Sequence, residues 1–287
     1  MSPLMQANEP AFADTWDRTF EAPTENLSSL LSRTAERYPN EKAVVSLYQQ
    51  NHARNSDYQN GNKTEHLTWT FAHLQRESLK LAACLSSKGI KPGDRVVVML
   101  YNQAEWCLLF WATAHLGCQF VPLDPRGLGR KEDVRHFMTT LQPTALVVGT
   151  PDMAATVDGI VGEIQGAAPV ARFVVSDEDD ELLLGWASLP VAMKEPVHSA
   201  QSTLPRSPAR PNDPAVVFFT SGTSALPKCC PQSAVNIASP ALAYSKLLGI
   251  DSKHSVCQHL PSFHVFSVVI TKRRICGLPK PDVRPRS

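Results

Sequence analysis

The sequence has no long apolar run, no strong charge imbalance and no cysteine pattern typical of a metal site. No segment approaches the roughly 18 uninterrupted apolar residues that a membrane-spanning helix needs. The 28 basic and 27 acidic side chains give a formal net charge of +1, so no global field attracts nucleic acid or an anionic membrane. We therefore expect no transmembrane segment and no nucleic-acid partner, and any anion site must be local.

The seven cysteines are scattered along the chain and include no CxxC pair. Cys229 and Cys230 are adjacent, which suits neither an ordinary disulfide nor a metal knuckle. This pattern predicts reduced thiols in an intracellular protein. The first residues, MSPLMQANEPAFADTW, lack the basic stretch and apolar core of a secretory signal. We expect a soluble, cytoplasmic protein, with a peroxisomal address left open.

Apolar strands and amphipathic helices alternate through the first part of the 287-residue chain. The expected strands are 43–48, 67–69, 95–100, 145–149 and 172–176. The expected helices are 27–38, 71–88, 103–117, 129–143 and 152–165, and residues 118–125 are expected to lead into a loop. Strands that alternate with helices at this spacing predict parallel βαβ units in a layered α/β fold.

The composition changes at residues 190–214, where six prolines leave no room for a long helix. We expect this stretch to be a Pro-rich connection inside a domain that spans residues 25–270. A buried strand at 215–220 and a helix at 232–249 with an irregular middle are expected to follow it. An N-terminal extension at 1–24 and an atypical basic tail at 271–287 complete the predicted organisation.

The strongest functional signal is VVFFTSGTSALPK at residues 216–228. A buried strand runs directly into small hydroxyl residues and Gly222, and the stretch ends at Lys228. Backbone N–H groups and hydroxyls gathered at a strand end can cradle phosphate oxygens, and glycine lets the chain approach an anion closely. The alternative is a Ser/Thr-rich turn with a solvent-exposed lysine, because short turns of this composition are common.

A nucleotide-hydrolysing P-loop is the nearest rival interpretation. Gly222 and Lys228 have the separation of that motif. However, Pro227 stands where its second glycine belongs, and Cys229 stands where its Mg²⁺-binding hydroxyl belongs. Proline has no N–H to donate to a phosphate. The two mismatches disfavour this rival.

The full string TSGTSALPK and three other blocks resemble the adenylate-forming (AMP-binding) superfamily, which includes acyl-CoA synthetases, luciferases and the adenylation domains of peptide synthetases. The phosphate-loop signature of that family is Thr-Ser-Gly-Thr-Thr-Gly, any residue, Pro-Lys, and this chain departs from it at Ser224 and Ala225. The other blocks follow in the family's order: LTWTFAHL (67–74), GCQFVPLDP (117–125) and LPSFHVFS (260–267). The resemblance covers about residues 25–270.

The resemblance implies the N-terminal part of an acyl-CoA synthetase-like α/β fold with largely parallel sheets. It implies an enzyme that uses ATP with Mg²⁺ to convert a carboxylic acid into an acyl-adenylate. The acyl group then passes to the thiol of coenzyme A or of a carrier-protein phosphopantetheine. The implied phosphate-binding residues are Thr220, Ser221, Gly222, Thr223, Ser224 and Lys228.

The resemblance also places His264 beside the carboxylic acid substrate. The competing interpretation is a packed core histidine, because His264 stands between Phe263 and Val265. A zinc site is disfavoured, since the spacing of His264 from the cysteine and histidines before it fits no standard zinc site.

The later blocks of the family do not occur in residues 229–287. These blocks supply contacts to adenine, ribose and Mg²⁺, and a catalytic lysine on a C-terminal lid. We therefore expect a truncated and inactive chain, with no catalytic residue and no resident metal, whose full-length parent carries the ligase activity. The alternative is a non-catalytic adenylation-like binding module.

Overall fold

A computed structural model describes residues 24–49, 66–164, 169–176, 183–195, 209–220, 226–250 and 254–271. The strands are β1 (Lys42–Ser46), β2 (Leu67–Thr70), β3 (Arg95–Met99), β4 (Gln119–Pro122), β5 (Ala145–Val148), β6 (Ala171–Val174), β7 (Ala187–Ser188), β8 (Pro214–Thr220) and β9 (Lys228–Ser233). The helices are α2 (Leu27–Arg37), α3 (Phe71–Ser87), α4 (Ala104–Leu116), α5 (Lys131–Leu141), α6 (Pro151–Val161), α7 (Leu189–Ala192), α9 (Ala234–Leu247) and α10 (Val265–Thr271), with a 3-10 helix η1 at Pro125–Gly129.

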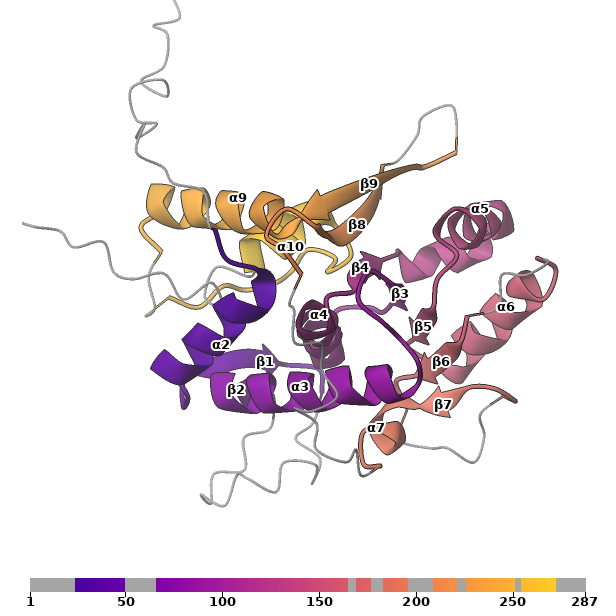
Figure 1. Ribbon diagram of the computed structural model, residues 1–287, viewed down its shortest axis with the longest axis horizontal. Helices are drawn as coiled ribbons and strands as arrows, with labels where there is room; N and C mark the ends of the chain where they lie inside the picture. Colours follow the sequence, from indigo (N-terminus) through magenta and orange to yellow (C-terminus); the bar gives the residue numbers. More distant parts are fainter. Residues whose placement is uncertain are drawn as a thin grey trace, which may run out of the picture.

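Most of these strands form one seven-stranded sheet with the order β7-β6-β5-β3-β4-β8-β9 (Figure 1). Every described pairing from β7 to β8 is parallel, and β9 pairs antiparallel with β8. Strands β1 and β2 form a separate antiparallel pair. This topology confirms the predicted α/β fold with a largely parallel sheet.

Side chains of the central strand β3 alternate between two apolar cores. Val96 and Val98 point into a core shared with α2, α3, α4 and α9. Val97 and Met99 point into a second core, shared with α5 and α6. Successive side chains of a strand face opposite sides of the sheet, so a continuous run of apolar residues predicts a strand that is covered on both faces. Figure 1 shows α5 and α6 on one side of the sheet and α3 and α4 on the other.

Helix α4 lies inside the first core and is therefore apolar nearly all the way round. The ring of Phe110 meets Trp111 edge-on at 5.0 Å between centroids and meets Phe120 of β4 at 5.4 Å. Trp106 meets Phe120 at 4.9 Å. The helix ends at Gly117, whose φ of 74° is the left-handed conformation that glycine adopts without strain. These aromatic contacts fix α4 beneath the strands that lead to the candidate site.

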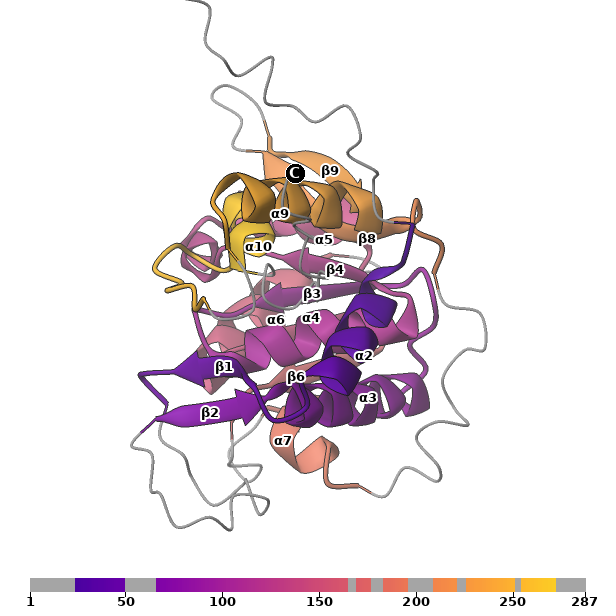
Figure 2. The same ribbon diagram turned by 90° about the vertical axis from the view of Figure 1, so that its left-hand side faces the viewer.

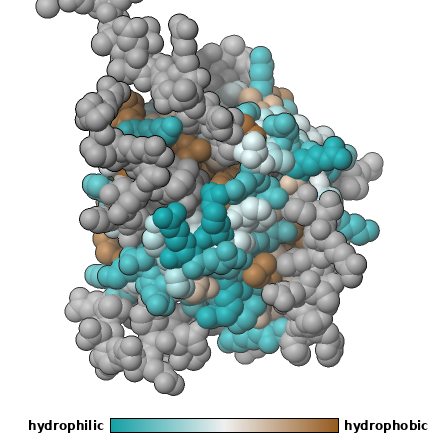
Figure 3. All heavy atoms as spheres, turned by 60° about the vertical axis from the view of Figure 1, so that its left-hand side comes forward, coloured by the Kyte–Doolittle hydropathy of each residue, from teal (hydrophilic) through white to brown (hydrophobic). Residues whose placement is uncertain are grey.

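Several helices begin on a side-chain cap. Asn26 accepts from the backbone N–H of Ser29 at 2.9 Å, and the Thr70 hydroxyl accepts from His73 N at 3.2 Å. The Ser233 hydroxyl caps α9 in the same way. Such caps satisfy N–H groups that have no partner inside the helix. On the face drawn in Figure 3, the coloured residues are mostly hydrophilic, with a few apolar ones among them.

The structure differs from the predicted elements at β9, α9 and β4. Residues 228–233, which include the start of the helix predicted at 232–249, form strand β9, and α9 begins at Ala234. Pro240 lies within α9 without ending it. Residues 119–122, predicted to lead into a loop, form the buried strand β4. Because β9 has a polar, proline-containing sequence, its extended form comes from pairing with β8.

The predicted N-terminal extension at 1–24 and basic tail at 271–287 stay predictions. Residues 1–23 and 272–287 lie outside the described ranges, as does the middle of the Pro-rich connection at 196–208. At the start of that connection the chain forms only the four-residue helix α7. None of the helices in the described ranges is long and apolar enough to cross a membrane.

The sheet is joined unevenly at β8. Strand β3 shares four registered residue pairs with β4 and four with β5. Strands β4 and β8 share one, Phe120 opposite Val216. Figure 2 shows β8, β9 and α9 together at one end of the molecule. We call the junction between β4 and β8 the β4–β8 seam.

Candidate functional site

Strands β8 and β9 form a hairpin whose last registered pair is Thr220 opposite Lys228. Both residues are exposed. Residues directly opposite each other in an antiparallel pair project to the same face, with Cβ atoms about 5 Å apart. The structure therefore brings the predicted hydroxyl and the predicted cation together at the end of the two strands. We call this pair of strands the phosphate hairpin.

The remaining predicted phosphate-binding residues lie outside the described residues. These are Ser221, Gly222, Thr223 and Ser224, which connect the two strands of the phosphate hairpin. Their proposed contacts with phosphate stay predictions. The described part of the site consists of the two strands and the residues that support them.

The phosphate hairpin lies at the carboxyl edge of the parallel sheet. Thr220 ends β8, Asp124 follows β4, and Asn102 follows β3, the next strand along. Parallel neighbours place their carboxyl ends at one edge of a sheet, and ligands of open α/β sheets bind in crevices at that edge. The three strand ends therefore present polar groups where a ligand of this fold class is expected.

Helix α5 contacts the strand ends of the phosphate hairpin. The Nε2 atom of His136 lies 2.8 Å from the carbonyl oxygen of Pro227. The ring of Phe137 lies 4.6 Å from that of Phe219, between centroids. Neither contact has a local signal in the sequence, because the partners are far apart along the chain: 91 residues separate His136 from Pro227.

His264 is exposed at the start of α10 and is not a packed core residue. Its Nδ1 accepts from the backbone N–H of Phe266 at 3.3 Å, and its carbonyl accepts from Val268 N at 3.2 Å. The imidazole thus sits beside the first turn of α10, with much of its surface open to solvent. No hydrogen bond joins it to Thr220 or Lys228 in the described part of the chain.

Asn102 ties the segment before His264 to the carboxyl end of β3. Its Nδ2 donates to the carbonyl of Leu260 at 2.8 Å, and its Oδ1 accepts from the backbone N–H of Ser262 at 2.7 Å. One side-chain amide thereby pairs with the backbone much as a neighbouring strand would. These two hydrogen bonds, which we call the Asn102 clamp, hold the backbone before His264 at the carboxyl edge of the sheet.

Arg126 adds a second link between the sheet edge and the same segment. Its guanidinium lies 5.5 Å from the ring centroid of Phe263, a cation–π distance. It also donates to the Asp124 carboxylate at 2.9 Å. This hydrogen bond and the charge of Asp124 raise the pKa of Arg126 above its ordinary value. The 260–264 segment is thus held from both β3 and β4.

Replacing Asn102 by alanine is expected to speed amide hydrogen exchange at Ser262 by about tenfold. The substitution removes two hydrogen bonds, each worth about 0.5–1.5 kcal/mol, and a change of about 1.4 kcal/mol is tenfold in an equilibrium constant. Gln103→Ala is the matched control, because Gln103 makes no side-chain capping bond to α4. Equal exchange at Ser262 in both variants would contradict the clamp.

The profile of one protein family, AMP-binding enzyme, matches residues 31–272. The chain belongs to this family. The match confirms the family resemblance that the phosphate-loop string and the other blocks indicated. The matched range also includes both strands of the phosphate hairpin and the whole of the 260–267 block.

Two curated relatives show what share of a family member's length this chain covers. It is 28% identical over 209 residues to the salicyl-AMP ligase / salicyl-S-ArCP synthetase of Mycobacterium tuberculosis, covering 72% of this chain and 33% of that protein. It is 25% identical over 196 residues to the long-chain-fatty-acid–CoA ligase FadD13 of the same species, covering 68% and 36%. The chain therefore spans about a third of the length of these relatives.

Solved structures show the same fold. The structure of VinN with L-aspartate superimposes with a TM-score of 0.69 at 19% identity, covering 89% of this chain and 56% of that one. The apo structure of Mycobacterium smegmatis MbtA gives a TM-score of 0.65 at 22% identity, covering 93% and 43%. At these identities the likeness shows the fold alone.

Proposed function

We propose that this chain supplies the nucleotide-phosphate cradle of an adenylate-forming acid–thiol ligase. The observation that carries the proposal is the pairing of Thr220 with Lys228 at the carboxyl edge of a parallel sheet in a member of the AMP-binding enzyme family. The reaction class is activation of a carboxylic acid by ATP. In the alternative, the chain is a non-catalytic binding module: the same residues bind phosphate, but no carboxylic acid is activated.

In the proposed reaction, a carboxylate oxygen attacks the α-phosphorus of ATP and pyrophosphate leaves. The main physical demand is to hold the leaving phosphates and to offset the charge that develops on them. Lys228 would offset part of that charge, and the hydroxyls and N–H groups of residues 220–224 would hold the β- and γ-phosphate oxygens. Mg²⁺ would enter with ATP as part of the substrate.

The proposed acid-binding part of the site is the 260–264 segment. His264 is exposed there, and the Asn102 clamp fixes the backbone that precedes it. A partly exposed imidazole next to a fixed backbone can donate a hydrogen bond to a carboxylate. We propose that the activated acyl group then passes to coenzyme A or to a carrier-protein phosphopantetheine. One relative is named a CoA ligase and the other a salicyl-S-ArCP synthetase.

We further propose that residues 1–287 by themselves form no acyl-adenylate. Binding ATP tightly requires contacts to adenine and ribose, and the sequence holds none of the family blocks that supply them. A few charge-assisted hydrogen bonds beside the exposed Thr220–Lys228 pair support an affinity near millimolar, about −4 kcal/mol, once the cost of immobilising the ligand is included.

The test is an ATP–pyrophosphate exchange assay on the purified chain with fatty, aromatic and amino acids, alongside titration calorimetry with magnesium pyrophosphate. We expect no exchange with any acid and weak, saturable binding of pyrophosphate near millimolar concentration. Exchange with any of the acids would show that the missing blocks are dispensable. Absence of pyrophosphate binding at tens of times that concentration would argue against the cradle itself.

A further inference from the structure

One hydrogen bond holds the backbone from which Lys228 projects. The Nε2 atom of His136 on α5 lies 2.8 Å from the carbonyl oxygen of Pro227, the residue directly before Lys228. A carbonyl can only accept, so Nε2 carries the proton and donates. Pro227 lies one residue beyond the registered pairs of β8 and β9. The bond therefore fixes the chain at the point where the strand ladder ends.

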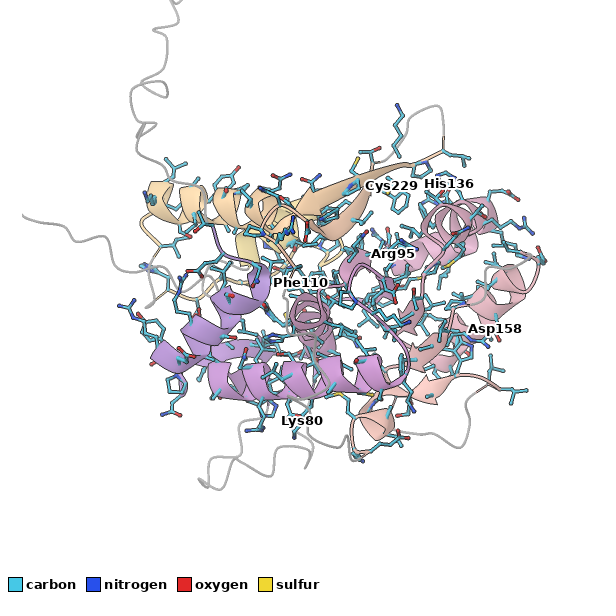
Figure 4. All side chains as sticks on the ribbon, in the orientation of Figure 1. Lys80, Arg95, Phe110, His136, Asp158 and Cys229 are labelled. Atoms are coloured by element: carbon cyan, nitrogen blue, oxygen red, sulfur yellow. The ribbon has the colours of Figure 1, made fainter. Side chains whose placement is uncertain are left out.

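The same helix also holds the other strand of the phosphate hairpin. The rings of His136 and Phe137 lie 6.3 Å and 4.6 Å from the ring of Phe219, between centroids. Phe219 directly precedes Thr220. Helix α5 thus contacts the residue before each member of the Thr220–Lys228 pair, and Figure 4 shows His136 between α5 and the end of the hairpin.

Helix α5 is anchored in the second apolar core and to Glu163 after α6, so it can support the end of the hairpin. Val134, Met138 and Leu141 are buried in the second apolar core. On the outer surface, Arg135 pairs with Glu132 at 2.6 Å and with Glu163, which follows α6. His136 is half-buried among aromatic rings, where a hydrogen bond competes less with water than it would on an open surface.

We propose that His136 is a positioning residue for the phosphate hairpin, which it aligns by donating from Nε2 to the carbonyl of Pro227. The inference rests on the proposed function, in which Thr220 and Lys228 meet phosphate. The donor is the Nε2–H group of the ring, because the carbonyl of Pro227 can only accept.

The test compares His136→Leu with His136→Gln. Leucine fills the space without a donor, whereas the amide nitrogen of glutamine can donate from nearly the position of Nε2. Thr139→Leu is the matched control, because Thr139 is an exposed position of the same helix. Two quantities are measured for each purified chain: site-resolved amide exchange at Thr220 and Lys228, and the dissociation constant for magnesium pyrophosphate.

We expect His136→Leu to speed exchange at Lys228 and to weaken pyrophosphate binding, each by about fivefold, as the loss of one hydrogen bond predicts. His136→Gln should restore both quantities to near the parent values, and Thr139→Leu should change neither. Unfolding transitions recorded by circular dichroism identify any variant whose whole fold is weakened.

Two outcomes would overturn the proposal. Parent-like exchange at Lys228 in His136→Leu would show that the bond does not hold the hairpin. A glutamine variant as defective as the leucine variant would show that the ring acts by packing and not by donation. Amide exchange at Lys228 could be faster in His136→Leu than in the parent and His136→Gln while no chain binds pyrophosphate. In that case the proposed function fails, but the anchoring of the hairpin by His136 is supported.

Discussion

Replacing Lys228 by alanine is expected to weaken the binding of magnesium pyrophosphate by at least about tenfold. Hydrogen bonds to charged groups contribute about 1.5–3 kcal/mol, and about 1.4 kcal/mol corresponds to a factor of ten. Lys228 stands opposite Thr220 and is exposed, so the alanine leaves the strand pairing in place while it removes the cation. Titration calorimetry at low ionic strength measures the effect.

The control for this prediction is Lys80→Ala. Lys80 is an exposed lysine on α3, where it pairs with Glu77 at 3.1 Å, and Figure 4 shows it far from the phosphate hairpin. Its replacement makes the same change in net charge, so it tests whether a general field attracts pyrophosphate. Equal losses in the two variants would assign the binding to overall charge and would remove Lys228 from the site.

Replacing Phe110 by alanine is expected to destabilise the fold by about 3–5 kcal/mol, the usual cost of removing a buried aromatic ring. Phe110 is 1% exposed and contacts the rings of Trp111 and Phe120. Its loss opens a cavity between α4 and β4, whose carboxyl end leads to the candidate site. Urea denaturation followed by tryptophan fluorescence measures the change in the free energy of unfolding.

The control for the stability prediction is Leu247→Ala. Leu247 is 61% exposed at the end of α9, so its truncation should change the free energy of unfolding by no more than about 0.5 kcal/mol. A loss of less than about 1.5 kcal/mol for Phe110→Ala would mean that the core collapses around the missing ring.

The parallel strands could be predicted because their own residues carry the signal. RVVVM of β3 and ALVV of β5 are continuous apolar runs, which indicate strands covered on both faces. Strand β9 could not be predicted in this way. Its residues, KCCPQS, have neither alternation nor high β-propensity. The extended form of β9 depends on β8, so it is a property of the pair.

The residues of the candidate site also fall into two groups: those that the sequence predicts and those that only the fold reveals. Thr220 and Lys228 belong to one contiguous string, whose composition and resemblance to a family indicated phosphate. Asn102 and His136 belong to no motif. Their partners Leu260 and Pro227 lie 158 and 91 residues away, and the bonds join side chains to backbone carbonyls, which leave no trace in the partner's residue type. Only the folded chain shows these two contacts.

The β4–β8 seam lies between the two groups of residues that make up the candidate site. In the described residues one registered pair, Phe120 opposite Val216, joins β8 to β4, and Asn102 and Arg126 lie in the segments that follow β3 and β4. Regions with few backbone bonds open at lower free energy than the rest of a protein. A ligand that touched both sides of the seam would tie the two parts together, and its binding energy would add to the stability of the joined form. Occupation of the site and the stability of the sheet at the seam would then be thermodynamically linked.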